Sequence, residues 1–302
     1  MDNNDSNKHK NKSKNTEPLE VLLARMEQSF VHDLETKPAQ PLPMLPEDMS
    51  AILNSLARSP TFAPLERGQK EILDKEILPT QGDVVIKYSG LRLSESDLDV
   101  YLIAIKMYSG VTPGESVEIS TKGFLKALNR NGGKSDRIWL KETLQRLGTG
   151  VTLEISSSKG LRSYFGPLLV TVVIEEERQH ISFSIPQDFL RFFSLEPWSQ
   201  ISLTKRFSLK GSGSQLAKWL HTYLVTHRRP YPMKLETYQK LSGSKIKQVR
   251  NYKIQMVKAL NLLKDNHLIH EWSINDDNLV YVWRRKEDLQ QPFLAFDSTD
   301  VE

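Results

Sequence analysis

Hydrophobic residues recur with two different periods from about residue 82 onward, and they predict a mixture of strands and helices. Apolar runs that alternate or continue over four to seven positions are typical of strands. They cover residues 84–88, 116–119, 151–155, 168–174 and 180–185. Apolar residues three and four apart predict helices from Ser94, over 121–129 and over 135–147. Ser94 followed by Asp97 resembles a capping box. We expect the later strands to form β-hairpins turning near 175–177.

A similar order then returns along the chain. The expected elements are a strand over 201–207, a helix over 212–226, a short helix over 235–241, a longer helix over 244–264, and a hairpin from 268–274 and 279–284. This succession is typical of a helix-turn-helix followed by a β wing. We therefore predict an α+β fold of two tandem winged-helix domains, preceded by a flexible N-terminal segment.

The N-terminal part divides into three segments. Residues 1–16 have lysines at positions 8, 10, 12 and 14 and cannot bury enough apolar surface to stay folded. Residues 17–33 can form a short amphipathic helix, and prolines at 38, 41, 43 and 46 predict an extended linker over 36–46. The expected division is a disordered and linker segment over 1–48, a first winged-helix domain over 49–195, a second over 196–288 and a tail over 289–302.

Composition narrows the classes of protein. The chain has 302 residues, no cysteine and a formal net charge of +4. The absence of cysteine excludes disulfides, cysteine zinc sites and thiol catalysis. Neither a secretory signal nor an apolar stretch of membrane-spanning length is visible, so we expect no membrane partner and a cytoplasmic location. The mildly basic balance is compatible with a nucleic-acid partner but does not require one.

The expected helix over 244–264 carries the strongest chemical signal. Apolar residues cluster on one side of it, as a recognition helix needs for its own core. The stretch has six basic residues and no acidic one, which favours a polyanion over a mixed-charge solvated face. Asn can pair with adenine and Lys with guanine, and nearby arginines suit phosphates. The candidate DNA contacts here are Arg228, Arg229, Ser244, Lys245, Lys247, Gln248, Arg250, Asn251, Gln255 and Lys258.

The corresponding helix over 135–147 gives a weaker signal. Its candidate contacts are Lys134, Ser135, Arg137, Lys141 and Gln145. Asp136 and Glu142 dilute the positive charge, so DNA binding and an ordinary surface remain equally supported. On the last hairpin Trp272, Tyr281 and Trp283 alternate. They suit either base stacking or, more simply, packing of the wing on its domain.

No catalytic constellation stands out, so we expect no enzyme activity, no catalytic residue, no metal and no cofactor. Gly133-Lys134-Ser135 looks like the end of a phosphate-binding loop, but position 128 is leucine where that motif needs glycine. We expect a turn in which Ser135 caps the next helix. His267 and His270 have metal-ligand spacing on a helix, but they begin an expected strand without a third ligand.

Three segments carry a resemblance to a known family. Residues 229–237, Arg-Pro-Tyr-Pro-Met-Lys-Leu-Glu-Thr, resemble the C-terminal winged helix of the TrfA family of plasmid replication initiators, and the likeness continues through Gly243-Ser244 and 275–277. Residues 86–90 with 93–97 resemble the start of that family's first winged helix. Residues 54–62, around Ala57-Arg58-Ser59, are similar to the segment before it. The likeness covers roughly residues 50–285.

The resemblance implies a plasmid DNA replication initiator. Such a protein binds direct repeats (iterons) in double-stranded origin DNA, helps open an adjacent A+T-rich region that becomes single-stranded, and helps recruit the host replicative helicase. It acts as a monomer on DNA, with an inactive dimer as a further state. The family also contacts the sliding clamp through a short N-terminal peptide, for which the nearest candidates are Gln40, Leu42, Met44 and Leu45. Prolines interrupt that pattern, so an ordinary linker is equally supported.

Two other functions remain open at this stage. A winged-helix transcription repressor without a role in replication would bind DNA through the same residues. A relaxase or nuclease would need a histidine cluster with a nucleophilic tyrosine, or a set of metal-binding carboxylates. The sequence shows neither arrangement.

Overall fold

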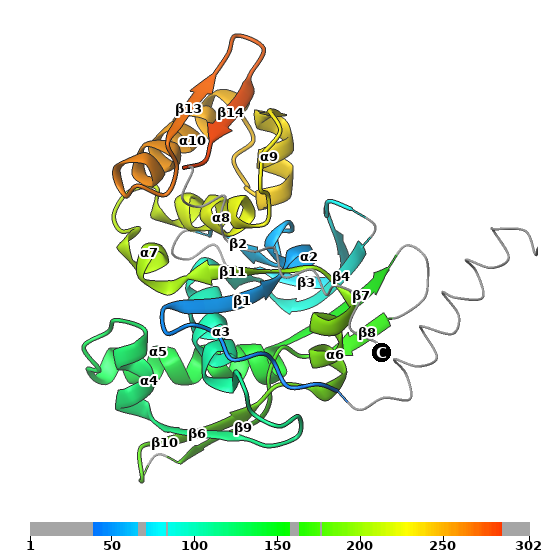
Figure 1. The fold of residues 1–302 in the computed structure, drawn as a ribbon, viewed down its shortest axis with the longest axis vertical. Helices are drawn as coiled ribbons and strands as arrows, with labels where there is room; N and C mark the ends of the chain where they lie inside the picture. Colours follow the sequence, from blue (N-terminus) through cyan, green and yellow to red (C-terminus); the bar gives the residue numbers. More distant parts are fainter. Residues whose placement is uncertain (1–38, 66–70, 83, 158–162, 176, 286–302) are drawn as a thin grey trace, which may run out of the picture. The chain divides into compact units, whose positions relative to one another are not determined.

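The computed structural model describes residues 39–65, 71–82, 84–157, 163–175 and 177–285 (Figure 1). These residues belong to one compact unit that begins at Ala39. The expected helix over 17–33, the lysines before it and the tail over 289–302 lie outside the described residues. The fold is a mixture of helices and strands, as the sequence predicts.

The first part of the fold is built around the long helix α3. It contains β1 (Met49–Leu53), α2 (Asn54–Ala57), β2 (Phe62–Ala63), β3 (Ile72–Leu78), β4 (Val84–Leu91), β5 (Leu93–Ser94) and α3 (Glu95–Tyr108). It continues through β6 (Val117–Ser120), α4 (Thr121–Ala127), α5 (Lys134–Gln145), the π-helical turn η1 (Arg146–Gly150), β7 (Val151–Ser157), β8 (Ser163–Gly166), β9 (Val170–Glu175), β10 (His180–Ser184) and α6 (Gln187–Leu195).

The second part begins with a strand that returns to the first. It contains β11 (Trp198–Ser202), α7 (Leu203–Ser208), α8 (Ser214–Val225), β12 (Met233–Lys234), α9 (Leu235–Ser242), α10 (Val249–Asp265), β13 (Glu271–Ile274) and β14 (Leu279–Trp283). Strand β11 pairs antiparallel with β1, and the two lie side by side in Figure 1. The chain therefore returns to β1, the first strand of the described fold, before it forms α7 to α10.

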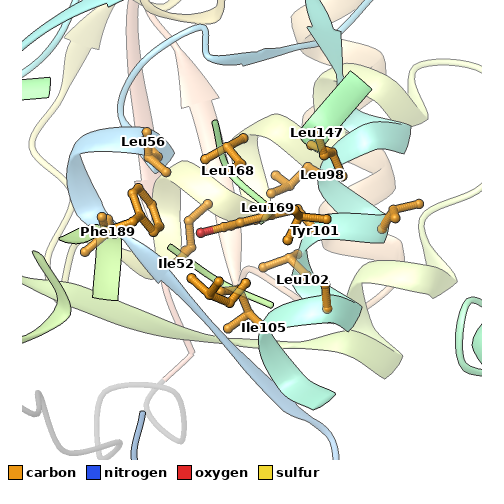
Figure 2. Packing of buried hydrophobic residues seen from close by; sticks show 14 of the residues in the cluster. Ile52, Leu56, Leu98, Tyr101, Leu102, Ile105, Leu147, Leu168, Leu169 and Phe189 are labelled. Carbon is orange, nitrogen blue, oxygen red and sulfur yellow. The ribbon is translucent and has the colours of Figure 1, made fainter. Parts of the chain in front are cut away.

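Buried hydrophobic side chains of the described residues form two clusters. The first runs from Ala39 to Leu203 and the second from Leu209 to Val282. Figure 2 shows the first, in which Leu98, Tyr101, Leu102 and Ile105 of α3 meet side chains from many other elements. The domain boundaries at 48/49, 195/196 and 288/289 stay predictions.

The same element order and strand order occur in both parts. Helix, strand, helix, helix, strand, strand describes α8, β12, α9, α10, β13 and β14. It also describes α3, β6, α4, α5, β9 and β10, except that η1, β7 and β8 are inserted between α5 and β9. The described strands form antiparallel sheets in the orders β6-β10-β9 and β12-β14-β13. In each sheet the third strand in sequence lies between the other two. We call α4–α5 the first helix pair and α9–α10 the second helix pair.

The capping box at α3 is confirmed. The Ser94 hydroxyl accepts a hydrogen bond from the backbone N–H of Asp97, and the Asp97 carboxylate accepts one from the backbone N–H of Ser94. Arg146 donates to the same carboxylate at 2.6 Å. The local signal at the start of α3 is thus reinforced by a tertiary contact from the end of α5.

Two strand predictions are wrong in part. Residues 203–207 are helical, because the Ser202 hydroxyl accepts from the backbone N–H of Lys205 and caps α7. The strand over 151–155 was expected to form hairpins with the strands over 168–174 and 180–185. The corresponding β7 pairs instead with β4 and with β8, a strand that the sequence analysis did not predict, in a separate sheet of order β3-β4-β7-β8. Apolar alternation predicts strands but does not determine which partner each strand finds.

Candidate nucleic-acid interface

The second helix pair is joined by a tight turn. Gly243 ends α9 with a left-handed backbone, φ +64°, and the backbone N–H of Ser244 donates to the carbonyl of Gln239. The Gln239 side chain donates in turn to the carbonyl of Ile246. These bonds hold residues 244–248 outside a helix, so α10 begins at Val249 and not at Ser244 as expected. Ser244, Lys245, Lys247 and Gln248 therefore belong to the turn.

Helix α10 has a buried face and an opposite face that is polar except for the exposed Ile254, and a groove-binding helix requires such a division. Its buried residues are Tyr252, Met256, Ala259, Leu260 and Leu263. On the other face Arg250, Asn251 and Lys258 are exposed and Gln255 is half-buried. Asn251 donates a long side-chain bond of 3.3 Å to Gln248, which brings the two amides together at the amino-terminal end of the helix.

The cations of the second helix pair differ in how they are held. Lys245 forms an ion pair with Glu71 at 2.7 Å. Among the described residues, none of the ion pairs includes Lys247, Arg250 or Lys258, and all three side chains are exposed. Over the ranges that the structure describes, positive charge without an ion-pair partner is thus found on the turn at Lys247, at the start of α10 at Arg250 and near its middle at Lys258.

Arg228 and Arg229 occupy the segment between α8 and β12, and both are exposed. The next three residues lead to Met233, which pairs with Val280 of strand β14. The segment thus enters the same sheet as the β13–β14 hairpin. This placement adds two cations beside that sheet rather than on the helix pair itself.

The first helix pair presents its candidate residues differently. Lys134, Ser135, Arg137 and Gln145 are exposed on α5, whereas Lys141 is half-buried and has a partner. Arg137 donates to the carbonyl of Gly132 and to the Gln179 side chain, both at 3.1 Å, so it is bound to the turn between β9 and β10. This arrangement leaves fewer cations able to turn toward a ligand.

The start of α5 corrects one prediction. The N-cap is Gly133, and Ser135 lies within the first turn and does not cap the helix. Asp136 supplies the side-chain contact instead, because its carboxylate accepts from the backbone N–H of Gly132. Asp136 also pairs with Arg130 at 2.9 Å, and that guanidinium lies 3.6 Å over the Trp139 ring. This acid is therefore already neutralised by a neighbour.

The wing aromatics divide between two roles. Trp272 is opposite Val282 across the hairpin and packs on the second cluster. Tyr281 and Trp283 stack on each other with ring centroids 6.1 Å apart, and the Trp283 side chain is 47% exposed. The expected packing holds for Trp272, while the stacked pair presents an aromatic surface that packing does not use.

The expected clamp-binding peptide is part of the core. Leu42 and Leu45 are buried in the first cluster, although Gln40 and Met44 are exposed. The Leu42 carbonyl accepts from the backbone N–H of Gly110 at 2.9 Å, and the backbone N–H of Leu45 donates to the Ser109 hydroxyl at 2.8 Å. The two leucines would have to serve as anchors, and their burial does not favour a clamp contact here; that contact stays a prediction.

Two titratable groups with clearly shifted pKa values lie inside the fold. Burial raises the pKa of Glu95 to about 7, and this carboxylate pairs with the buried Arg206. Burial, aided by the charges of Arg206 and Lys205, lowers the pKa of His221 to about 3, and this side chain lines a pocket that Lys205 and Arg284 also line. Across the described residues, no group of three or more histidine, aspartate or glutamate side chains is placed to hold a metal ion.

The structure identifies Glu71 as a contact that sequence analysis missed. This residue precedes β3 in a region without clear periodicity, and its carboxylate binds both Arg92 and the candidate Lys245. Hydrophobic periodicity reports neighbours within one element, so it could not predict an ion pair between Glu71 and Lys245, which lie far apart in the sequence. Within the described part of the chain, no helix is both long and apolar enough to cross a membrane.

Comparisons with known proteins agree with the resemblance found in the sequence. The plasmid replication initiator protein TrfA of Escherichia coli is 25% identical over 238 residues, which are 77% of this chain and 61% of that protein. Crystal structures of domains 2 and 3 of RctB superpose with a TM-score of 0.46 at 13% identity. One covers 76% of this chain and 96% of the other chain, and a selenomethionine derivative covers 70% and 85%. The family described as TrfA protein matches residues 22–284. The chain belongs to the TrfA family.

Proposed function

We propose that this chain is a plasmid replication initiator that binds repeated origin sites through two winged-helix domains. In this proposal α5 and α10 are the helices that enter successive major grooves, and the hairpins β9–β10 and β13–β14 are the wings. The repeated element order and the repeated strand order support this interpretation. The two helix pairs of one monomer then contact the two halves of one asymmetric repeat, in the way that the two subunits of a dimer contact two half-sites.

The observation that carries the proposal is the uniform charge of the second helix pair. From residue 244 to 264 every charged side chain is basic. Five residues of α10 from Tyr252 to Leu263 are buried in the second cluster, and the cations and amides lie on the opposite face together with the exposed Ile254. Such a face suits phosphates for affinity and base edges for specificity.

The family supports the wider role. The match covers 61% of the length of the Escherichia coli relative, so its activity as a whole is part of the proposal. We infer that the chain binds iterons, helps open an adjacent A+T-rich region and helps recruit host replication proteins.

The experiment begins with selection of duplexes by the full-length chain from a random library. The selected sequence, placed as direct repeats beside an A+T-rich segment, should make a plasmid dependent on this chain for its maintenance. Permanganate should then detect unpaired thymines only when the chain is present. Enrichment of a site that represses a promoter but never supports maintenance would favour the repressor instead.

We also propose that the chain has no chemistry of its own. The phosphate-loop pattern fails at Leu128, and Lys134 and Ser135 lie on the surface of α5. Purified protein should neither hydrolyse ATP nor nick supercoiled origin DNA with magnesium. Nicking abolished by substitution of one tyrosine or one carboxylate would contradict this proposal and favour a relaxase or nuclease.

A further inference from the structure

Two arginines of the first part each bind the carboxyl-terminal end of a helix in the second part. Arg58 ends α2, which packs against α8. Its Nε donates to the Thr226 hydroxyl at 2.8 Å and its Nη2 to the Thr226 carbonyl at 2.6 Å. Arg92 donates from Nη2 to the Gly243 carbonyl at 2.8 Å. Thr226 and Gly243 are the C-caps of α8 and α9, so each guanidinium meets the negative end of a helix dipole.

The contact at Gly243 is closely fitted. The Arg92 side chain is 7% exposed, and its Nη1 is held by Glu71 at 2.7 Å. A Cβ atom at Gly243 would lie 2.0 Å from Arg92 Nη2 and 2.6 Å from the Pro60 side chain. Because φ at Gly243 is +64°, glycine also suits the backbone there. The turn of the second helix pair is therefore shaped against the first part of the molecule.

A buried ion cluster joins the same two parts at another place. Arg206, which is fully buried, donates to Glu95 at 2.7 Å and to Asp99 at 2.6 Å on α3. It also donates to the Thr222 hydroxyl on α8 at 2.8 Å. Helix α8 packs against α10. The orientation of α10 is thus linked to α3, whose own successors form the first helix pair.

We propose that Arg58 and Arg92 are positioning residues that fix the second helix pair relative to the first, and so set the spacing of the two DNA segments that one chain accepts. This inference rests on the proposed function. One inserted base pair moves the second segment by about 3.4 Å and rotates it by about 34°. A rigidly held α10 cannot follow that movement, whereas a loosened one can.

The test uses the full-length chain and the duplex that it selects from the random library. Hydroxyl-radical footprinting locates the two protected segments, and one base pair is inserted between them. Wild-type protein should lose about tenfold or more in affinity on the expanded duplex, as expected when one segment is mismatched. The double variant R58Q/R92Q should lose less than about threefold between the two duplexes. Fluorescence anisotropy measures both dissociation constants.

The matched control is K87Q/R191Q. It removes two cations of the first part whose ion pairs, with Glu154 at 2.8 Å and Asp188 at 3.0 Å, stay within that part. The control should keep the wild-type penalty for the insertion. Gly243→Ala, which displaces Arg92 from the other side, provides a second variant if the double variant does not fold. It should relax the penalty as R58Q/R92Q does.

The outcomes separate two failures. If wild-type protein enriches no sequence, the proposed function itself fails and this inference fails with it. If it binds a two-segment site but R58Q/R92Q and Gly243→Ala keep the full insertion penalty, the two arginines do not position α10. Equal weakening on both duplexes would likewise assign them only to stability or overall charge.

Discussion

The two helix pairs share an element order and differ in how charge is arranged on them. Near α5, Asp136 and Glu142 lie among the basic residues, and Arg137 is bound to the turn between β9 and β10. From residue 244 to the end of α10's basic stretch at 264, acidic residues are absent from the sequence. The comparison shows that one topology can carry two different charge distributions. We expect α10 to supply most of the affinity and α5 to supply the register.

The pairs also differ in what holds them. The first is held by its own surroundings, such as Arg130 over Trp139. The turn of the second pair is held by residues of the first part: Arg92 donates to the Gly243 carbonyl, and Glu71 forms an ion pair with Lys245. A helix pair that depends on a neighbouring region cannot be oriented by its own sequence alone.

The largest expected effect is the loss of stability on removing the buried Arg206, which connects the two parts. Arg206→Met leaves Glu95 and Asp99 buried without their guanidinium. Removing one partner of a buried ion pair costs about 3–5 kcal/mol, so the free energy of unfolding should fall by that amount in urea titrations. Lys87→Met, at a half-exposed pair, should cost less than about 1 kcal/mol. Equal losses would show that the buried cluster has no special role.

A second prediction concerns pH and the core beneath the second helix pair. The pKa of His221 is lowered to about 3 in the folded chain, against an ordinary value of 6.5. As pH falls from 6.5 toward 3, the unfolded state takes up a proton that the folded state refuses. Stability should decline over that range by at most about 1.4 kcal/mol per pH unit for this group.

Substitution tests this assignment. His221→Gln should flatten the dependence of the unfolding free energy on pH by about one proton. His227, with a pKa lowered to about 4, keeps part of the slope in this variant. An unchanged slope for His221→Gln would contradict the burial of a neutral imidazole.

The third prediction compares sequence recognition by the two pairs. Asn251→Ala should cost about 1–3 kcal/mol on the selected duplex and change base preference at one position, because a bidentate contact with adenine is lost. Gln145→Ala on α5 should cost less than about 1 kcal/mol. Anisotropy titrations against a set of single-base variants measure both effects. A larger loss for Gln145→Ala would reverse the expected division of labour.

The smallest effect concerns contacts with phosphate. Arg228→Ala or Arg229→Ala should weaken binding to all sequences alike and reduce the slope of log affinity against log salt by about 0.9. Arg137→Ala should change the slope less, since its guanidinium is already bound within the first part. Identical slopes for the three variants would show that the two regions contact phosphate equally.

Local patterns were sufficient for many of the elements. The capping box at Ser94 and Asp97, the amphipathic α9 and the final hairpin were predictable, because each depends on side chains a few positions apart. The start of α10 was not. Residues 244–246 are held by Gln239 of the preceding helix, and such a bond competes with helix formation without leaving a periodic signal.

The sequence by itself determined the repeated order of elements, the uniform charge of residues 244–264 and the resemblance to the TrfA family. Only the tertiary structure decided which strands pair, that Leu42 and Leu45 belong to the core, and that Arg58, Arg92 and Arg206 connect the two parts. The physical reason is distance along the chain. Periodicity and capping report neighbours within one element, whereas strand pairing and buried ion pairs join residues that meet only after the chain has folded.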